Sequence, residues 1–294
     1  MVHVGLIGAG RVGRTLTALL PREQFQLGPV LGRTPTSTRR SVREMAHGTA
    51  AGDIEAFSIC DVILVAVPDS ALTQVVGQLA AAELRLAKTV VLQTSRIHDS
   101  NDLQRLRRRG AAVGSLQPLF ALRRPVPSLA GVYCAVEGDA AATRMARKMI
   151  RSWDGEFHLV RAEQKIHLGV ASSMAADFLP GLLEMIVRQL SLAGFLKKRS
   201  LRAVSHILDS AFQEYARSGR RMRAGPLLRN ETATVQRYIE RLDQMDPRMS
   251  DAYRQTALQT LEVLRRMNDD FAFLEHPTAA GGRAMRASAG GGSK

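Results

Sequence analysis

The fold of this chain is decided by Gly8-Ala9-Gly10-Arg11-Val12-Gly13, a Gly-x-Gly-x-x-Gly turn close to its start. The turn follows an apolar run typical of a buried strand, Val2–Ile7, and opens a segment with apolar residues at helical spacing, Val12–Leu20. In that context the first glycine permits a tight turn, the second lets the backbone approach a pyrophosphate, and the third allows close helix–strand packing. We therefore predict that these six residues bind the phosphates of a dinucleotide at a helix N-terminus. The alternative is a glycine turn that serves only the fold.

The second predicted strand, Gln26–Leu31, is followed by a basic and hydroxyl-rich stretch, residues 33–40. Proteins that bind NAD place an Asp or Glu about 20 residues beyond the glycine turn to hold the ribose 2′-OH. No carboxylate stands there in this sequence, and the planar donor fork of Arg suits a 2′-phosphate. The sequence therefore predicts NADP(H), with Arg33 as the main contact and support from Thr34, Ser37, Arg39 or Arg40. A solvated basic loop is the alternative.

Two further strand ends are expected to border the same crevice, because ligands of open parallel sheets bind beyond the carboxyl ends of the strands. One apolar run ends at Val67 and is followed by Pro68. Another run ends at Gln93 and is followed by Thr94 and Ser95. We predict that Val67, Pro68, Thr94 and Ser95 lie beside the cofactor.

Apolar strand-like runs alternate with helical patterns up to about residue 160, which is typical of a mostly parallel sheet covered on both faces. After Arg161 only long helical patterns follow, and Pro180 inside the first of them should kink it or break its hydrogen bonding. We predict an α/β fold with an N-terminal doubly wound (Rossmann) domain, residues 1–161, and an all-α domain, residues 162–275. Residues 276–294 are predicted to be a disordered tail. The helices are predicted at residues 12–20, 41–47, 71–82, 99–109, 140–153, 162–196, 200–217, 231–244 and 247–274.

The chain is strongly basic: 41 basic and 27 acidic residues give a net charge of +14, and 35 of the basic residues are Arg. Such a balance is typical of proteins that meet nucleic acid, an acidic surface or a phosphorylated ligand, and it also arises from an Arg-favouring genome. No helix-turn-helix, zinc-finger or RNA-stacking pattern accompanies the Arg residues, and only 5% of residues are aromatic. We therefore expect no specific nucleic-acid partner.

The sequence predicts neither a membrane partner nor a metal. No run reaches the roughly 18 consecutive apolar residues of a membrane helix, and the N-terminus lacks the pattern of a signal peptide. Cys60 and Cys134 stand inside apolar runs and form no disulfide framework, and no His, Cys or carboxylate spacing resembles a metal site. We expect a cytoplasmic protein.

Several short motifs point to one family: the glycine turn, Ala66-Val67-Pro68-Asp69, Gln93-Thr94-Ser95, Gly114–Phe120, Ala135–Asp139 and Gly225–Arg229. Together they resemble the Rossmann-like proteins with a C-terminal domain of unknown function 2520, relatives of pyrroline-5-carboxylate, ketopantoate and deazaflavin-dependent NADP reductases. This resemblance implies a nicotinamide cofactor and a proton-transferring group near the start of the long helix. The chain departs from the family at Gln117-Pro118, where the family has His-Pro, and at Gln93–Arg96, where it has His-x-Ser-Gly.

The start of the long helix offers four candidates for proton transfer: Lys165, His167, Ser173 and Asp177. His167 titrates nearest to neutral pH, although a lone His near a helix start is often only a surface or capping residue. Ser173 and Asp177 are four residues apart and share one helix face.

For an anionic substrate the candidates are Gln117, Arg123 and Arg229, since Arg binds carboxylates through paired hydrogen bonds. The turn that carries Arg229 can equally be purely structural. We expect an NADP(H)-dependent oxidoreductase acting on a small, anionic carbonyl or imine compound, and a homodimer formed through the C-terminal helices. The alternatives are a non-catalytic NADP-binding sensor or partner protein, which the departures from the family favour, and a deazaflavin-dependent NADP reductase.

Overall fold

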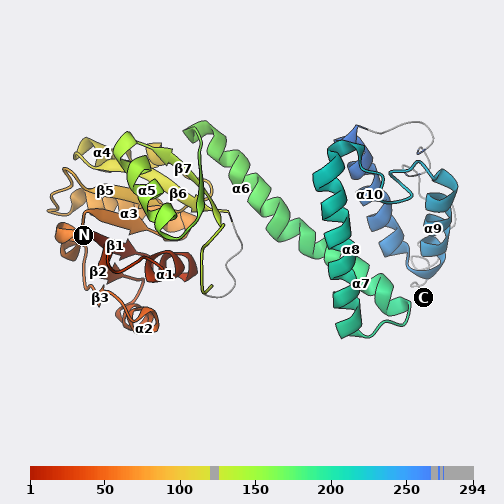
Figure 1. Ribbon diagram of the computed structural model, residues 1–294, viewed down its shortest axis with the longest axis horizontal. Helices are drawn as coiled ribbons and strands as arrows, with labels where there is room; N and C mark the ends of the chain where they lie inside the picture. The colour runs from red at the N-terminus through yellow and green to blue at the C-terminus, as the bar shows by residue number, and fades with distance from the viewer. Residues whose placement is uncertain (120–125, 266–270, 272–273, 275–294) are drawn as a thin grey trace, which may run out of the picture. The chain divides into compact units, whose positions relative to one another are not determined.

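The computed structural model describes residues 1–119, 126–265, 271 and 274 (Figure 1). The chain divides into two compact units, Met1–Leu179 and Pro180–Lys294, each of which is considered by itself. The predicted domain boundary at residue 161 marks where the strands end, whereas the first compact unit continues to Leu179. The helix after the sheet belongs to that unit because its Lys165 and Gly169 contact the loop after the fifth strand.

The first unit is built on one eight-stranded sheet with the order β3-β2-β1-β4-β5-β6-β7-β8. Every neighbouring pair is parallel except β6 and β7, which are antiparallel. The predicted doubly wound, mostly parallel sheet is therefore confirmed. The strands are β1 (Val2–Ile7), β2 (Phe25–Leu31), β3 (Thr49–Ala50), β4 (Val62–Val65), β5 (Val90–Gln93), β6 (Ala112–Pro118), β7 (Tyr133–Gly138) and β8 (Glu156–Leu159).

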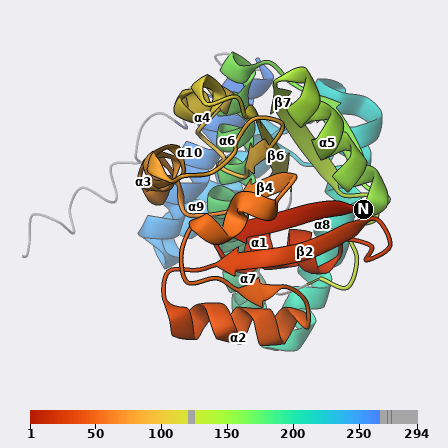
Figure 2. The ribbon, with the colours of Figure 1, turned by 90° about the vertical axis from the view of Figure 1, so that its left-hand side faces the viewer.

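Two apolar layers enclose the sheet, because its central strands are apolar on both faces. Alternate residues of β1, β4 and β5, such as Leu64, pack with helices α1 (Arg11–Ala18), α2 (Pro35–Met45) and α5 (Ala140–Ser152). Their neighbours, such as Val65, pack on the other face with η1 (Glu55–Ile59), α3 (Asp69–Ala81), η2 (Ser100–Leu103) and α4 (Gln104–Arg108). Figure 2 shows α2 beside the edge that β2 and β3 form.

Local differences from the predicted elements have local causes. Helix α2 begins at Pro35, not near Ser41, because Thr34 and Ser37 form a capping box and Pro suits the first helical position. Strand β3 was not predicted, because a two-residue exposed strand carries no apolar run. The predicted helix over residues 99–109 is a 3₁₀ turn, η2, followed by α4.

The long helical segment after the sheet changes its hydrogen bonding before Pro180, as predicted. It consists of η3 (Ala162–Gln164), α6 (Lys165–Ser173), the π-helical turn η4 (Met174–Phe178) and α7 (Leu179–Leu192). Proline has no N–H for an α-helical bond, and in the wider turn the N–H of Leu179 donates to the carbonyl of Met174. The segment ends at Leu192, before the predicted Leu196, because Gly194 adopts a left-handed φ of 88°.

Helix, and no strand, forms the described part of the second unit, which confirms the predicted all-α region. Val235, Ile239, Ala257 and Leu261 form its apolar core. Helix α10 ends at Leu264, before the predicted Leu274, and Arg265 follows with φ 54°. The tail, residues 276–294, lies outside the described residues. The helices after α7 are α8 (Lys197–Ser218), η5 (Gly219–Arg221), α9 (Thr232–Met245) and α10 (Pro247–Leu264).

An apolar surface lies along the helical segment Ala162–Leu192. By length and composition alone this segment could cross a membrane, and its apolar stretch is not buried. This segment contains no long run of consecutive apolar residues, because polar residues interrupt it. Four exposed side chains recur at four-residue spacing and share one face. We call them the apolar stripe: Ile166, Val170, Met174 and Phe178.

The stability of the sheet unit should depend on the layer around Leu64, which is fully buried in the same apolar cluster as Trp153. Leu64→Ala should lower the free energy of unfolding by about 2–5 kcal/mol, because it leaves a cavity. Leu159→Ala on β8, where the side chain is half exposed, should cost at most about 1 kcal/mol. Urea unfolding followed by fluorescence measures both, since Trp153 is the only tryptophan. Equal losses in the two variants would contradict the described core.

Candidate functional site

Two glycines of the turn are required by the fold itself. Gly8 has φ 97°, a conformation that side chains disfavour, and an added Cβ would lie 2.4 Å from the carbonyl oxygen of Ala66. A Cβ on Gly13 would lie 2.4 Å from the carbonyl oxygen of Gly8. The glycine turn therefore packs directly on the chain that leaves β4, and any larger residue at either position would push the two apart.

Gly10 is different, because nothing in the described part of the chain explains it. Its φ of −75° suits any residue, and apart from its chain neighbours no described heavy atom lies within 4 Å of the place where a Cβ would stand. Gly10 is the N-cap of α1, no side chain of the described residues caps that helix end, and its first turn holds no acidic residue. The open side of Gly10 thus leaves the positive end of α1 accessible to an anion such as a pyrophosphate.

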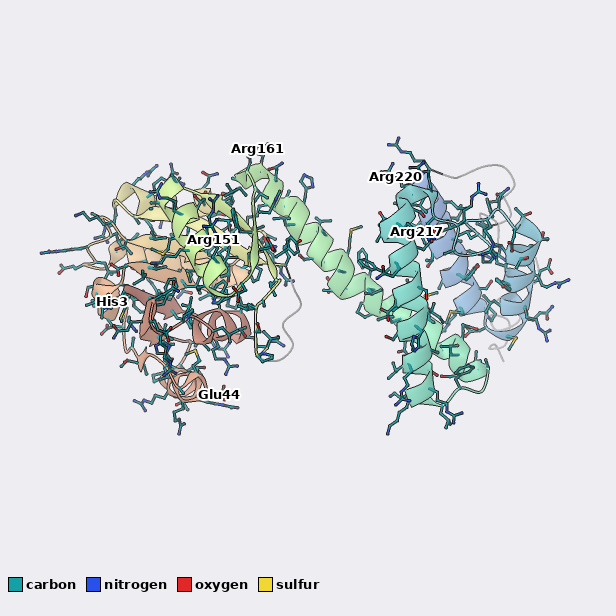
Figure 3. The ribbon with its side chains drawn as sticks, in the orientation of Figure 1. His3, Glu44, Arg151, Arg161, Arg217 and Arg220 are labelled. Atoms are coloured by element: carbon teal, nitrogen blue, oxygen red, sulfur yellow. The ribbon has the colours of Figure 1, made fainter. Side chains whose placement is uncertain are left out.

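Helix α2 supports the turn from the side. The hydroxyl of Ser41 donates to the carbonyl oxygen of Ala9 at 3.2 Å. Glu44, labelled in Figure 3, pairs with Arg14 of α1 and accepts from Nε of Arg40 at 2.7 Å. These contacts hold α1 and α2 together on either side of the glycine turn.

The hydroxyl-rich stretch after β2 is the start of α2 and not a loop, which corrects the predicted helix start. Thr34 Oγ1 accepts from the N–H of Ser37, and Ser37 Oγ accepts from the N–H of Thr34, both at 3.2 Å. The predicted contacts Thr34 and Ser37 therefore already have a structural role as helix caps. Arg33 and Arg39 are exposed here, and Arg40 is paired with Glu44.

The ends of β4 and β5 lie next to each other in the sheet, with Val65 opposite Gln93. Val67 follows β4, and Pro68 is the N-cap of α3. Thr94 follows β5 and is half-buried. Ser95 is buried and shapes the next loop, because its Oγ accepts from the N–H groups of Ile97 and His98 at 3.1 and 2.9 Å.

Lys165 is the one proton-transfer candidate that the structure buries. Its side chain is 1% exposed, and Nζ donates to the carbonyl oxygen of His98 at 2.5 Å. Gln93 Nε2 donates to the same oxygen at 2.6 Å. Burial lowers the pKa of Lys165 to about 8, although nearby carboxylates, first among them Glu137, oppose that shift. Lys165 can therefore exchange a proton near neutral pH.

A row of buried polar side chains crosses the sheet beside Lys165. Gln93, Ser115 and Glu137 are register neighbours on β5, β6 and β7, and Gln117 lies two residues beyond Ser115. All four are at most 3% exposed. Within the described residues, Ser115 Oγ, both amide atoms of Gln117 and both carboxylate oxygens of Glu137 have no hydrogen-bond partner. Each such buried group costs about 1–3 kcal/mol, so the row calls for an explanation.

Sequence reasoning missed Glu137 as a site residue, although a signal was present. An acidic residue interrupts the apolar strand Tyr133–Gly138, and such a residue is rarely buried without a function or a partner.

The other three candidates for proton transfer lie elsewhere on the helix. His167 is exposed, and Ser173 Oγ donates to Asp177 Oδ2 at 2.6 Å, as their spacing predicts. Ser173 stands two turns beyond Lys165, about 12 Å along a helix axis. The structure therefore does not gather the four groups into one site.

The predicted anion-binding residues are separated too. Arg229 pairs with Glu231 at 2.6 Å and donates to the carbonyl oxygen of Ala224 at 3.1 Å. The bond to Glu231 raises the pKa of Arg229. This pairing supports the structural interpretation of its turn. Gln117 belongs to the buried polar row of the first unit, and Arg123 lies outside the described residues.

The sheet order and the glycine turn define a Rossmann-like domain, followed in this chain by a helical region. Residues 1–118 match the family model of the Rossmann-like domain, and residues 132–260 match that of the domain of unknown function DUF2520. The chain therefore belongs to the Rossmann-like proteins with a C-terminal DUF2520 domain.

The solved structures that resemble this chain include several reductases. A provisionally assigned NADP oxidoreductase from Bacteroides fragilis has a TM-score of 0.68 at 16% identity, covering 89% of this chain and 98% of that one. An imine reductase from Streptomyces aurantiacus has a TM-score of 0.57 at 17% identity, covering 98% of this chain and 95% of that one. A pyrroline carboxylate reductase from Plasmodium falciparum with NADP bound has a TM-score of 0.56 at 11% identity, covering 95% of this chain and 98% of that one. No curated protein sequence matches the chain.

The three glycines should respond differently to the same substitution. Gly8→Ala and Gly13→Ala should each lower the midpoint of urea unfolding, because each added methyl meets backbone at 2.4 Å. Gly10→Ala should change the midpoint far less, since the space beside Gly10 is open. Trp153 fluorescence measures all three. A loss with Gly10→Ala as large as with Gly8→Ala would show that the turn has a different conformation.

Proposed function

We propose that the protein is an NADP(H)-dependent oxidoreductase that reduces the C=O or C=N bond of a small substrate. The observation that carries this proposal is the open side of Gly10 at the uncapped N-terminus of α1. Gly8 and Gly13 are explained by packing, whereas Gly10 is explained by a ligand whose phosphates approach the backbone. The reductases of the same fold support the choice of a nicotinamide dinucleotide.

The preference for NADP(H) over NAD(H) rests on the end of β2. Arg33 and Arg39 are exposed around the N-terminus of α2, and neither Asp nor Glu occurs among residues 32–43. Two guanidinium groups suit the double charge of a 2′-phosphate, which an acidic residue would repel. The hydroxyls of Thr34 and Ser37, held by the capping box, stand in the same turn.

Bound NADPH would supply the hydride. The chain would bind the coenzyme, orient the substrate and supply a proton to it. The glycine turn would hold the pyrophosphate, and Val67, Pro68, Thr94 and Ser95 would border the nicotinamide at the ends of β4 and β5. Lys165 is our candidate for the proton donor, because it is buried beside the β5 end with a pKa of about 8. Ser173, Asp177 and His167 remain weaker candidates.

Two further expectations accompany the proposal. A homodimer through the C-terminal helices is supported by the apolar stripe, since a contiguous exposed apolar face marks an interaction site. An anionic substrate is supported only by the basic charge of the chain, because Arg229 already has a carboxylate partner. The cytoplasmic location stays a prediction.

Coenzyme binding should separate the roles of Gly10 and Arg33. Gly10→Ala should weaken NADPH and NADH binding at least about tenfold each, because its methyl occupies the place of the pyrophosphate. Arg33→Ala should weaken NADPH about ten- to a hundredfold and leave NADH unchanged, because only NADPH carries the 2′-phosphate. Fluorescence titration of the reduced coenzymes measures both effects.

Arg43→Ala is the matched control for Arg33→Ala, since Arg43 is exposed near the other end of α2. It should bind both coenzymes as the unaltered protein does. Wild-type protein that binds NADH as tightly as NADPH would refute the preference, and a Gly10→Ala variant with full affinity would refute the site.

Turnover should depend on Lys165. NADPH oxidation is followed at its absorbance maximum with cyclic imines and 2-oxo acids as substrates, and kcat of Lys165→Met should fall at least about a hundredfold. The rate of the wild type should fall as the pH rises through about 8, because Lys165 then loses the proton it must donate.

Lys148→Met, a change at an exposed lysine of the same unit, serves as the control and should keep its activity. NADPH binding by Lys165→Met checks that the variant is folded. If His167→Ala or Asp177→Ala abolishes turnover and Lys165→Met does not, the proton donor is misassigned. NADPH binding without turnover of any compound in the screen would favour a sensor.

A further inference from the structure

The face of the sheet that packs on α3 and α4 changes from apolar to polar on β5 and β6, at the level of the carboxyl end of β5. Ile63, Val91 and Val113 are register neighbours on this face and belong to one apolar cluster. One step further along the same face, Gln93 and Ser115 take the equivalent places, and Glu137 follows on β7. An apolar core thus ends in a buried polar row, where a sheet of this kind binds ligands.

Among the residues that the structure describes, most side chains of the polar row lack hydrogen-bond partners. Gln93 bonds to the backbone of Ser95 and His98, but Ser115, Gln117 and Glu137 present five polar atoms without a partner in the described structure. These three side chains are each at least 97% buried. Native proteins satisfy most buried polar groups, so a cluster of free donors and acceptors indicates a missing ligand group.

We propose that Ser115, Gln117 and Lys165 form the site that receives the polar atom of the substrate's C=O or C=N bond, and that Glu137 is a positioning residue that keeps the proton on Lys165. The proposal rests on the function proposed above and adds the substrate-facing half of that site. Ser115 and Gln117 can each donate and accept, so they suit a carbonyl oxygen as well as an imine nitrogen.

The chemistry balances with these groups. A bound reduced nicotinamide coenzyme would supply the hydride that the substrate carbon accepts, and the electron pair of the double bond would move to the oxygen or nitrogen. Lys165 Nζ gives its proton to that atom and becomes a neutral amine, which is reprotonated from water. The product is an alcohol or an amine, and the coenzyme leaves oxidised.

Four carboxylates from three directions act on Lys165: Glu137 of β7, Asp99 and Asp102 after β5, and Asp69 of α3. Asp102 is exposed and bonded to His98 Nδ1 at 3.0 Å, and Asp99 and Asp69 are partly exposed. Water screens those three, whereas Glu137 lies in the low-dielectric interior. Glu137 should therefore contribute most to keeping Lys165 charged.

The direct test is an NMR titration of Lys165, which needs neither coenzyme nor substrate. Lysine labelled with ¹³C at Cε gives only six side-chain signals, and the one that is lost in Lys165→Met is that of Lys165. In the wild type it should titrate near pH 8, and in Glu137→Gln it should titrate about one pH unit lower or more. An unchanged titration in Glu137→Gln would overturn the proposal.

Matched variants keep this test decisive. Glu156→Gln makes the same change at an exposed glutamate of β8 and should leave the Lys165 signal unmoved. Glu137→Asp keeps the negative charge but shortens the side chain by one methylene. The titration midpoint of Lys165 in this variant should therefore fall between those in the wild type and in Glu137→Gln. Glu137→Asp also replaces Glu137→Gln if that variant does not fold.

Kinetics test the catalytic part separately. The alkaline limb of kcat in Glu137→Gln should move to lower pH by the shift seen in the NMR titration, and a purely structural role would not move it. Gln117→Leu should raise KM for the substrate and leave the affinity for NADPH unchanged. An alkaline limb that stays in place while the NMR signal shifts would overturn the proton-donor role. A wild-type protein that does not bind NADPH would instead refute the proposed function. The NMR titration would still test the interaction between Glu137 and Lys165.

Discussion

The close approach of Gly8 to the carbonyl of Ala66 is the constraint on which the first unit depends. It joins the turn after β1 to the chain that leaves β4, so that the two central strands end at one place. Only a residue without a side chain fits there, and only a residue that tolerates φ 97° can make the turn. The direction of α1, and with it the position of its N-terminus, follows from that contact.

A second connection ties the helical segment to the sheet. Lys165, at the start of α6, reaches the carbonyl oxygen of His98, which Gln93 of β5 also contacts. A buried ammonium group needs such acceptors and a nearby carboxylate, because burial without them would neutralise it. Lys165, which anchors the helix, thus has a pKa of about 8 and lies next to the polar row. In the proposed reaction, a structural and a chemical role would coincide in this one side chain.

The apolar residues account for the parts that could be predicted from the sequence. Continuous apolar runs such as Val62–Val65 indicate strands buried on both faces, and the glycine spacing after β1 indicates the phosphate-binding turn. Helix α2 was predicted too short because its first turns carry hydroxyl and basic residues, whose capping role depends on Thr34 and Ser37 meeting each other. The residue type alone favours His167, yet it is exposed, and Lys165 is the buried group with a lowered pKa.

By itself the sequence determined the class of fold, the order of the long strands and helices along the chain and the place of the glycine turn, because hydrophobic periodicity and glycine spacing are local properties. Only the tertiary structure decided which polar groups are buried together. Gln93, Ser115, Glu137 and Lys165 are distant in sequence, and they become neighbours through the pairing of β5, β6 and β7 and the return of α6 to the sheet. Burial, and with it the pKa of Lys165, is a property of that assembly and not of any one residue.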